Sequence, residues 1–512
     1  MRSHPRRTHT RSVLAAALLG LAACGGGTSP TAPTTPPPPV PLRLAGPSAV
    51  APLTIPTPSP SLDLATQLAA LPGVASVVEG AAPPAGTRFF VLAFDRPVDH
   101  CEPGGARFQH RATLLWKGAT APTVLAATGY AIGTGTGQAE LTLLLNANQV
   151  RMEHRYFGLS VPAVLDWSKL DLFQAASDQH QLVETLKPLL TGPWVTTGAS
   201  KGGMTSVYHR AFYPDDVAAT VAYVAPVVLS NADARYVPFL ESIGPPSCRE
   251  ALHAVQNAIL RSHAGIEPLM AASVASFRDA YLTFGLSRTL DLAALELQFT
   301  FWQYGGEAGC ASIPGPGATA AVLLDFMDWV YGGWPGGTAW AWGDATLQYY
   351  APYYYQSSTQ LGYPALPQAH LLAALGGAPL VDDGSIYPPL GVTRPWDGQA
   401  IPAVEAWVRV RGDRIMFIYG GRDPWSGGQF TPSAGGVKHV VATANHGASI
   451  SMLPNAEYAA AAATLRGWLG LPAAVMAPVA AARLAPVSDG GEVDPSVLHG
   501  RWLRRARALP PP

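Results

Sequence analysis

The chain has 512 residues, of which 48% are hydrophobic and 13% charged, a balance typical of a globular enzyme rather than a disordered chain. This length predicts one large domain with an insertion, or two domains. The formal net charge of −1 supplies no long-range attraction for nucleic acid or anionic membranes, so neither is expected as a partner. No group of His, Cys, Asp and Glu has the spacing of metal ligands, so no metal or other cofactor is expected.

Residues 1–23 have the pattern of a signal peptide, with a basic start, the short apolar run SVLAAALLGLAA and small residues at the end. The run is shorter than the roughly 20 residues that span a membrane. Leu21 to Cys24 resembles the bacterial lipobox, in which the cysteine is lipidated and becomes the first mature residue. The sequence therefore predicts an exported protein. It is either a cell-envelope lipoprotein whose one membrane contact is a lipid on Cys24, or a secreted protein in which Cys24 is incidental.

Residues 24–61 are rich in proline, which favours an extended, semi-rigid chain with no core of its own. Such a segment is typical of a tether. It would place the folded part of the chain outside the cytoplasm.

Strands and helices alternate over the next part of the chain. The expected strands are TRFFVLAF (87–94), ARFQHRATLLWKG (106–118), APTVLAATGY (121–130), QVRMEHRYFG (149–158), PWVTTGAS (193–200) and VAATVAYVAPV (217–227), with helices at 170–190 and 201–212. Most of these strands are continuously apolar, which predicts a mainly parallel sheet covered on both faces.

The alternation stops at about residue 231 and resumes with strands at 414–425 and 438–447 and a helix at 456–470. Between them, residues 231–400 have helical periodicity and many aromatic residues. This arrangement predicts an α/β-hydrolase core (62–230 and 401–480) with a large, mainly helical lid inserted after the sixth strand. The tail, 481–512, has no clear periodicity.

Three cysteines remain once Cys24 is set aside, and export permits disulfides. Cys248 and Cys310 both lie in the predicted lid, so we expect them to pair. Cys101, in the loop VDHCEPGG, would then be free; a nucleophilic Cys101 is the alternative.

The motif Gly198-Ala199-Ser200-Lys201-Gly202 stands between a predicted strand and a predicted helix. In α/β-hydrolases such a turn carries the nucleophilic serine, and the acid and the histidine follow in that order. Asp423 and His446 each follow a later strand, at the edge of the sheet where these folds bind ligands. We therefore predict Ser200 as the nucleophile, His446 as its base and Asp423 as the residue that orients the histidine.

Each of these residues also has a purely structural interpretation. Asp423 precedes a proline and could end a turn, and His446 could be an ordinary loop histidine. The competing histidines His154 and His209 lie within a strand and a helix, and Asp413 precedes its strand, so none of them fits the plan.

The oxyanion hole is expected to use the backbone N–H of Lys201 and one from the loop TGYAIGTGTG, with Tyr130 as the donor. The side chain of Lys201 could add positive charge near the oxyanion. An exposed, solubilising lysine is the favoured interpretation.

The segments QHRATLLWKG, QVRMEHRYFG, DWSKLDLFQAASDQHQLVETLKP, TTGASKGGMTSVYHRAFYPDDVAATVAYVAP, FWQYGG, RIMFIYGGRDPW and NHG resemble the PS-10 or S37 peptidase family over residues 88–450. That family is related to the S28 prolyl carboxypeptidase and dipeptidyl peptidase group. The resemblance implies an α/β-hydrolase core with a helical lid, and Ser200, Asp423 and His446 match the triad positions. It also implies release of short peptides, commonly tripeptides, from free amino termini, often at proline. The lipobox and the alanine at 199, where the family pattern leads us to expect glycine, depart from it.

An aminopeptidase needs a carboxylate to bind the substrate ammonium group, and Glu153 and Glu241 are the candidates; Glu153 could instead bond Arg151 or Arg155. Trp302, Tyr304 and Trp425 could form an apolar wall for a proline ring, or simply pack in a core. Two other functions stay open: a carboxylester hydrolase with the same triad, and a surface scaffold that has lost catalysis. The oligomeric state is left open.

Overall fold

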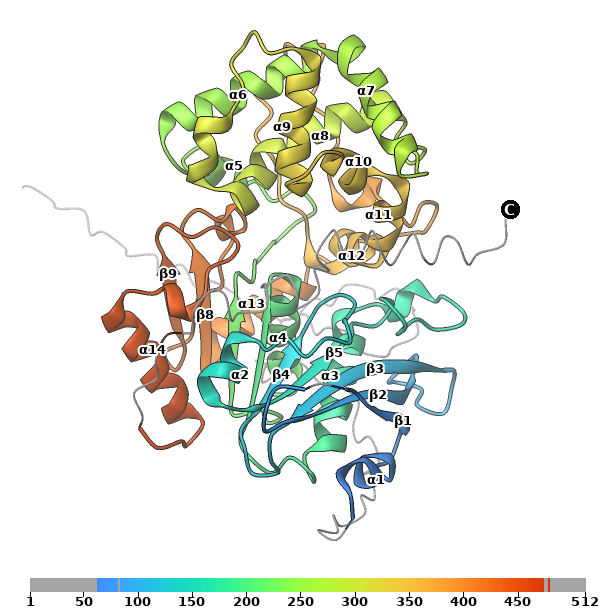
Figure 1. Ribbon diagram of the computed structural model, residues 1–512, viewed down its shortest axis with the longest axis vertical. Coiled ribbons are helices and arrows are strands. Elements are labelled where there is room, and N and C mark those ends of the chain that lie inside the picture. Colours follow the sequence, from blue (N-terminus) through green and yellow to red (C-terminus); the bar gives the residue numbers. More distant parts are fainter. Residues whose placement is uncertain (1–61, 82, 474–477, 479–512) are drawn as a thin grey trace, which may run out of the picture.

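The computed structural model describes residues 62–81, 83–473 and 478, whose strands form one nine-stranded sheet (Figure 1). The strands are β1 (Val74–Glu79), β2 (Arg88–Pro97), β3 (Arg107–Trp116), β4 (Thr123–Ala127), β5 (Asn148–Met152), β6 (Trp194–Ala199), β7 (Ala219–Tyr223), β8 (Ile415–Gly420) and β9 (Val437–Val441). Their order is β1-β2-β3-β5-β4-β6-β7-β8-β9. The pairs β1–β2, β2–β3 and β3–β5 are antiparallel. The pairs β5–β4, β4–β6, β6–β7, β7–β8 and β8–β9 are parallel. The mainly parallel sheet and the α/β-hydrolase class are thus confirmed.

Helices cover both faces of this sheet. They are α1 (Leu64–Ala69), α2 (Glu140–Leu145), α3 (Leu172–Leu186), α4 (Lys201–Phe212), α13 (Ala400–Arg411) and α14 (Asn455–Trp468). One hydrophobic cluster joins α3, α4 and α13 to β7 and β8, and another joins α2 and α14 to the opposite side of the same strands. Every residue of β4, β5, β7 and β8 is consequently buried, as expected for parallel strands between two helical layers.

The sequence analysis missed β1, so the insertion follows the seventh described strand rather than the sixth. β1 lies at the sheet edge, pairs only with β2, and has four exposed residues among its six. A strand that buries so little apolar surface leaves no clear periodicity in the sequence.

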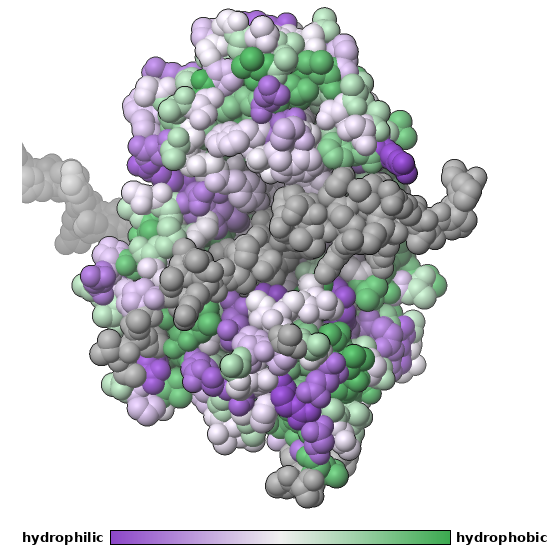
Figure 2. All heavy atoms as spheres, viewed as in Figure 1, coloured by the Kyte–Doolittle hydropathy of each residue, from purple (hydrophilic) through white to green (hydrophobic). Residues whose placement is uncertain are grey.

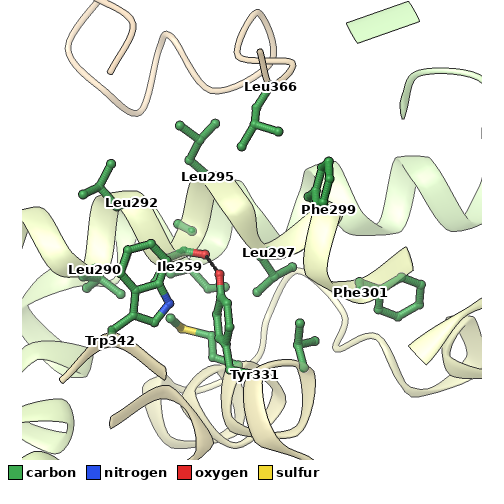
Figure 3. Packing of buried hydrophobic residues seen from close by; sticks show 14 of the residues in the cluster. Ile259, Leu290, Leu292, Leu295, Leu297, Phe299, Phe301, Tyr331, Trp342 and Leu366 are labelled. Carbon is green, nitrogen blue, oxygen red and sulfur yellow. Dashed lines mark hydrogen bonds between the residues drawn. The ribbon is translucent and has the colours of Figure 1, made fainter. Parts of the chain in front are cut away.

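The insertion between β7 and β8 consists of helices gathered beyond one edge of the sheet (Figure 1). They are α5 (Tyr236–Leu240), α6 (Pro246–Arg261), α7 (His263–Ser276), α8 (Leu286–Thr300), α9 (Ala320–Gly332), α10 (Gly337–Trp342), α11 (Asp344–Tyr349) and α12 (Ala351–Gln356). They have a hydrophobic core of their own, part of which Figure 3 shows, with Tyr331 donating a hydrogen bond to the carbonyl of Ala293 on α8. The insertion is thus an independently packed helical layer.

The cysteines agree with the sequence analysis in one case and differ in another. Cys248 and Cys310 form the expected disulfide, which closes a loop of 62 residues in the insertion. Cys101 is also disulfide-bonded, so the predictions of a free thiol and of a nucleophilic Cys101 are wrong. The predicted free thiol followed from setting Cys24 aside for lipidation, which left an odd number of cysteines.

Hydrophilic and hydrophobic residues are mixed over both the insertion and the sheet domain on the face drawn in Figure 2. Within residues 62–81, 83–473 and 478, no helix has the length and apolar character needed to cross a bilayer. The predicted signal peptide (1–23), tether (24–61) and tail (481–512), and Cys24 with them, lie outside the described residues.

Candidate active site

Ser200 lies in a strained turn between β6 and α4. Its backbone has φ 54° and ψ −126°, a conformation that residues other than glycine rarely adopt. Its N–H donates a hydrogen bond to the carbonyl of Tyr223 at 2.9 Å. Strain of this kind costs about 1–3 kcal/mol and is typical of functional positions. The turn therefore has the geometry of a nucleophile elbow.

The glycines of the motif are required by close backbone contacts. A Cβ atom at Gly198 would lie 2.3 Å from the carbonyl oxygen of Gly202, and one at Gly202 would lie 2.3 Å from that of Ala127. Both distances are far below van der Waals contact, so no larger residue fits at either position. Ala199, by contrast, is accommodated in β6, as expected.

Asp423 and His446 meet at the carboxyl edge of the sheet. Asp423 follows β8, is fully buried, and places Oδ2 at 2.8 Å from Nδ1 of His446. Its other oxygen, Oδ1, accepts a hydrogen bond from the N–H of Trp425 at 3.1 Å. The backbone N–H of His446, in turn, donates to the carbonyl of Gln303 in the insertion at 3.2 Å. The imidazole is thus held by a carboxylate on one side and anchored to the insertion through its backbone.

A cavity of about 220 Å³ lies between the sheet edge and the insertion, and Ser200, Tyr304 and Trp425 are among its lining residues. The rings of Tyr304 and Trp425 each have centroids 6.4 Å from that of His446. Ser200 thus lines the cavity directly, and the Asp423–His446 pair lies next to two residues of the cavity wall.

The insertion supplies most of the aromatic wall of this cavity. Besides Tyr304, these residues are Tyr331, Trp340, Trp342, Tyr350, Tyr353 and Tyr354. The sequence analysis noted the dense aromatics of this segment but assigned them no role. Their concentration in one short stretch of an otherwise ordinary helical insertion was the available signal.

The backbone around the predicted oxyanion hole is closely packed. Lys201 is the first residue of α4, where helix N–H groups have no partner within the helix. Gly129 has φ 76°, and a Cβ there would lie 2.7 Å from the backbone nitrogen of Gly202, so the loop before Tyr130 touches the first turn of α4. Tyr130 lines the cavity, and its N–H makes a long hydrogen bond of 3.3 Å to the hydroxyl of Thr128. A bond this long is readily exchanged for one to an oxyanion.

The side chain of Lys201 is buried, so the interpretation as an exposed lysine is wrong. Its Nζ donates to the carbonyl of Gly129 at 2.6 Å and lies 5.3 Å from the ring centroids of Tyr130 and Phe157. Burial lowers the pKa of Lys201 well below its ordinary value. The side chain therefore lies against the loop before Tyr130, where its amino group bonds the carbonyl of Gly129.

Glu153 is fully buried, and its carboxylate is occupied by internal partners. It forms an ion pair with Arg111 and accepts hydrogen bonds from the N–H groups of Ile132 (3.0 Å) and Leu159 (2.9 Å) and from Ser160 Oγ (2.8 Å). It is not among the cavity-lining residues. Glu153 therefore braces the loop after β4 instead of facing substrate.

Two other predicted binding residues also lie away from the cavity. Glu241 is exposed at the end of α5. Trp302 is fully buried in the core of the insertion, against Gly244, where a Cβ would lie 2.0 Å from its ring. Tyr304 and Trp425, by contrast, are placed in the wall where the sequence analysis expected them.

The competing groups have other partners. His209 Nε2 lies 2.8 Å from Asp216, and His154 bonds the carbonyl of Arg155 and, at 3.3 Å, the hydroxyl of Tyr208. Among the described residues, no group of three or more His, Cys, Asp or Glu is arranged to hold a metal ion.

A parallel sheet with a serine elbow after β6, an aspartate after β8 and a histidine after β9 is the plan of a serine hydrolase of the α/β-hydrolase class. The model of the PS-10 peptidase S37 family matches residues 58–495. The chain belongs to this family and is a serine peptidase.

A prolyl tri/tetrapeptidyl aminopeptidase of Streptomyces mobaraensis is 37% identical over 440 residues, which cover 84% of this chain and 90% of the relative. Similar solved structures include a proline iminopeptidase of Mycobacterium smegmatis, 11% identical with a TM-score of 0.30 over 74% of this chain and 98% of that one. They also include the peroxisomal α/β-hydrolase Lpx1 of Saccharomyces cerevisiae, 10% identical with a TM-score of 0.32 over 84% and 98% of the two chains.

Proposed function

We propose that the protein is an exopeptidase that releases tripeptides or tetrapeptides, often at proline, from free amino termini. The observation that carries this proposal is the Asp423–His446 pair, 2.8 Å apart, next to Tyr304 and Trp425 in the wall of the cavity that the strained Ser200 also lines. The named relative, 37% identical over most of both chains, supports the choice of substrate.

Catalysis proceeds by two acyl transfers. His446 takes the proton of Ser200 as Oγ attacks the peptide carbonyl, and Asp423 stabilises the resulting imidazolium and fixes its tautomer. The tetrahedral oxyanion is stabilised by the N–H groups of Lys201 and Tyr130. His446 then protonates the leaving amine, and the peptide remains esterified to Ser200. Water, deprotonated by His446, attacks this ester and releases the short peptide.

The insertion acts as a lid over this chemistry. It supplies most of the aromatic wall of the cavity, Tyr304 included, and Trp425 is added from the turn that follows β8. Apolar rings of this kind provide a surface on which a proline ring can pack.

The test uses Ala-Ala-Pro-p-nitroanilide with a free or an acetylated amino terminus. We expect the free substrate to be cleaved and the acetylated one to be poor. Ser200→Ala is expected to lose both the activity and labelling by a fluorophosphonate, while folding as the native protein does. Equal cleavage of the acetylated substrate would overturn the exopeptidase proposal. Hydrolysis of p-nitrophenyl butyrate with no cleavage of either peptide would favour a carboxylester hydrolase, and failure of the fluorophosphonate to label Ser200 would favour a non-catalytic scaffold.

We further propose that the protein is exported. The disulfide between Cys248 and Cys310 and the disulfide bonding of Cys101 support an oxidising compartment. Fractionation of cells grown with an alkynyl fatty acid tests this. Label that is lost in Cys24→Ala would indicate a lipid anchor, and unlabelled protein in the medium would indicate secretion. Recovery of the protein from the cytoplasm with reduced cysteines would contradict export.

A further inference from the structure

Glu296, on α8 of the insertion, lines the same cavity as Ser200. Among the described lining residues it is the one carboxylate. Ser200 belongs to the sheet edge and Glu296 to the insertion, so the two residues come from the two opposed parts that enclose the cavity.

Buried tyrosines hold the Glu296 side chain in place. Its Oε1 accepts hydrogen bonds from the hydroxyls of Tyr387 (2.6 Å) and Tyr363 (2.9 Å). The Tyr387 hydroxyl also lies 3.1 Å from Oδ1 of Asp382, but its single proton serves the shorter contact to Glu296. Two tyrosine hydroxyls therefore hold the carboxylate in one orientation.

Glu296 and Asp382 are the two acids of this buried cluster. Burial and the nearby charge of Glu296 raise the pKa of Asp382 well above its ordinary value, which favours its protonated form. Burial also raises the pKa of Glu296, but the hydroxyls of Tyr387 and Tyr363 oppose this rise by stabilising the charged form.

No cationic side chain among the described residues contributes to the stabilisation of Glu296. A carboxylate accepts about four hydrogen bonds, and Tyr387 and Tyr363 supply two, both to Oε1, so acceptor capacity remains. Burying a charge without a counter-ion costs free energy, and a cation with hydrogen-bond donors would both neutralise the carboxylate and use its remaining acceptor positions.

A second polar group in the cavity wall also lacks a partner. Trp342 is 4% exposed and lines the cavity, and its indole N–H has no hydrogen-bond partner among the described residues. Its ring lies next to that of Tyr387, with centroids 6.5 Å apart, and Figure 3 shows it beside Tyr331 below α8. An N–H donor close to a fixed carboxylate suits a peptide terminus, where a backbone carbonyl follows the ammonium group.

Building on the proposed exopeptidase function, we infer that Glu296 binds the free α-ammonium group of the substrate and so sets how many residues are released. Three extended residues span about 10 Å, so the ammonium group of a bound tripeptide lies well away from its scissile carbonyl. Glu296 on the insertion would hold the amino terminus while Ser200 at the sheet edge attacks the scissile carbonyl. The distance between these two residues would then set the number of residues released. An acetylated terminus has neither the charge nor the donors to satisfy Glu296.

The test compares Glu296→Gln with Glu241→Gln, which changes an exposed carboxylate of the same insertion. Each variant is assayed on free and acetylated Ala-Ala-Pro-p-nitroanilide and on p-nitrophenyl acetate, which has no ammonium group. For E296Q we expect kcat/KM on the free peptide to fall about 100-fold, as when one partner of a buried charge pair is lost. Ester hydrolysis and fluorophosphonate labelling are expected at native rates, and E241Q is expected to behave as the native protein.

A second variant, Glu296→Asp, guards against a folding defect. Aspartate keeps the carboxylate on a side chain that is one methylene shorter. Glu296→Asp should therefore retain much of the preference for the free amino terminus that E296Q loses. Two results would overturn the inference: E296Q keeping the native preference for free over acetylated peptide, or E296Q and E296D both losing ester hydrolysis together with the peptide activity. The proposed function fails separately, if the native protein does not discriminate between the two peptides at all.

Discussion

Replacing Lys201 by methionine tests whether its buried side chain positions the oxyanion loop. Methionine keeps the length of the side chain but removes the 2.6 Å hydrogen bond to Gly129 and the amino group that faces Tyr130 and Phe157. Loss of a whole oxyanion donor costs about 10²–10³ in turnover. In Lys201→Met the Tyr130 N–H is still present but its loop is no longer anchored, so we expect kcat to fall by about 100-fold at most, with a smaller change in KM.

Whereas kcat should fall, the free energy of unfolding of Lys201→Met should stay the same or rise. Because burial lowers the pKa of Lys201, the unfolded chain binds the lysine proton more tightly than the folded chain at neutral pH. Lys201 therefore reduces the free energy of unfolding at pH 7, and this effect shrinks as the pH rises toward the ordinary lysine pKa of 10.5. K201M should consequently be at least as stable as the native protein at pH 7, with a smaller advantage at pH 9.

Steady-state kinetics on the free tripeptide substrate and urea unfolding at pH 7 and pH 9 measure these two effects. Lys187→Met, at a partly exposed lysine paired with Glu184, is the matched control and should change neither. A kcat for K201M within threefold of the native value would refute the positioning role. A loss of kcat accompanied by a comparable loss of stability would show that the effect is general unfolding.

Three further predictions concern stability. Ser200→Gly should exceed Ser200→Ala in free energy of unfolding by about 1 kcal/mol in urea titrations, because glycine relieves the strain at φ 54°; equal values would mean that the turn is not strained. Burial lowers the pKa of His100, His110 and His154, so below pH 6.5 the unfolded chain takes up protons that the folded chain does not, and stability should fall by up to about 1.4 kcal/mol per pH unit for each. A free energy of unfolding that stays constant from pH 7 to pH 5 would contradict this. Cys248→Ser opens a loop of 62 residues and should lower the free energy of unfolding of the insertion by about 4 kcal/mol, measured by urea titration; a loss under 1 kcal/mol would show that packing alone holds it.

The positions of Ser200, Asp423 and His446 could be predicted because parallel strands end at one edge of a sheet. Strands with continuous apolar runs can be predicted from the sequence. A polar residue that follows such a strand must then lie at the carboxyl edge of the sheet, whatever the details of side-chain packing. β1 could not be predicted in the same way. Its partner β2 and its position at the sheet edge stabilise it, and neither leaves a pattern in its own six residues.

The carboxylate that we propose for the substrate ammonium group could not be predicted from the sequence. Glu153 follows a strand, as a site residue should, yet its carboxylate is taken by Arg111 and by neighbouring backbone N–H groups. Glu296 lies in the middle of a helix, where a glutamate is usually a solvent-facing residue. The tyrosines that fix it are 67 and 91 residues away in sequence, so its role follows only from the folded insertion.

The insertion also takes part in orienting the catalytic base. Besides the bond from the His446 N–H to the carbonyl of Gln303, the amide of Asn445 donates to the carbonyl of Tyr304 at 2.9 Å. Two successive residues of the histidine loop are therefore tied to the segment that follows α8, the helix that carries Glu296. A movement of α8 would change the position of the carboxylate and of the histidine loop together. The histidine loop and the carboxylate that we propose for the substrate ammonium group are thus attached to the same helix and the segment that follows it.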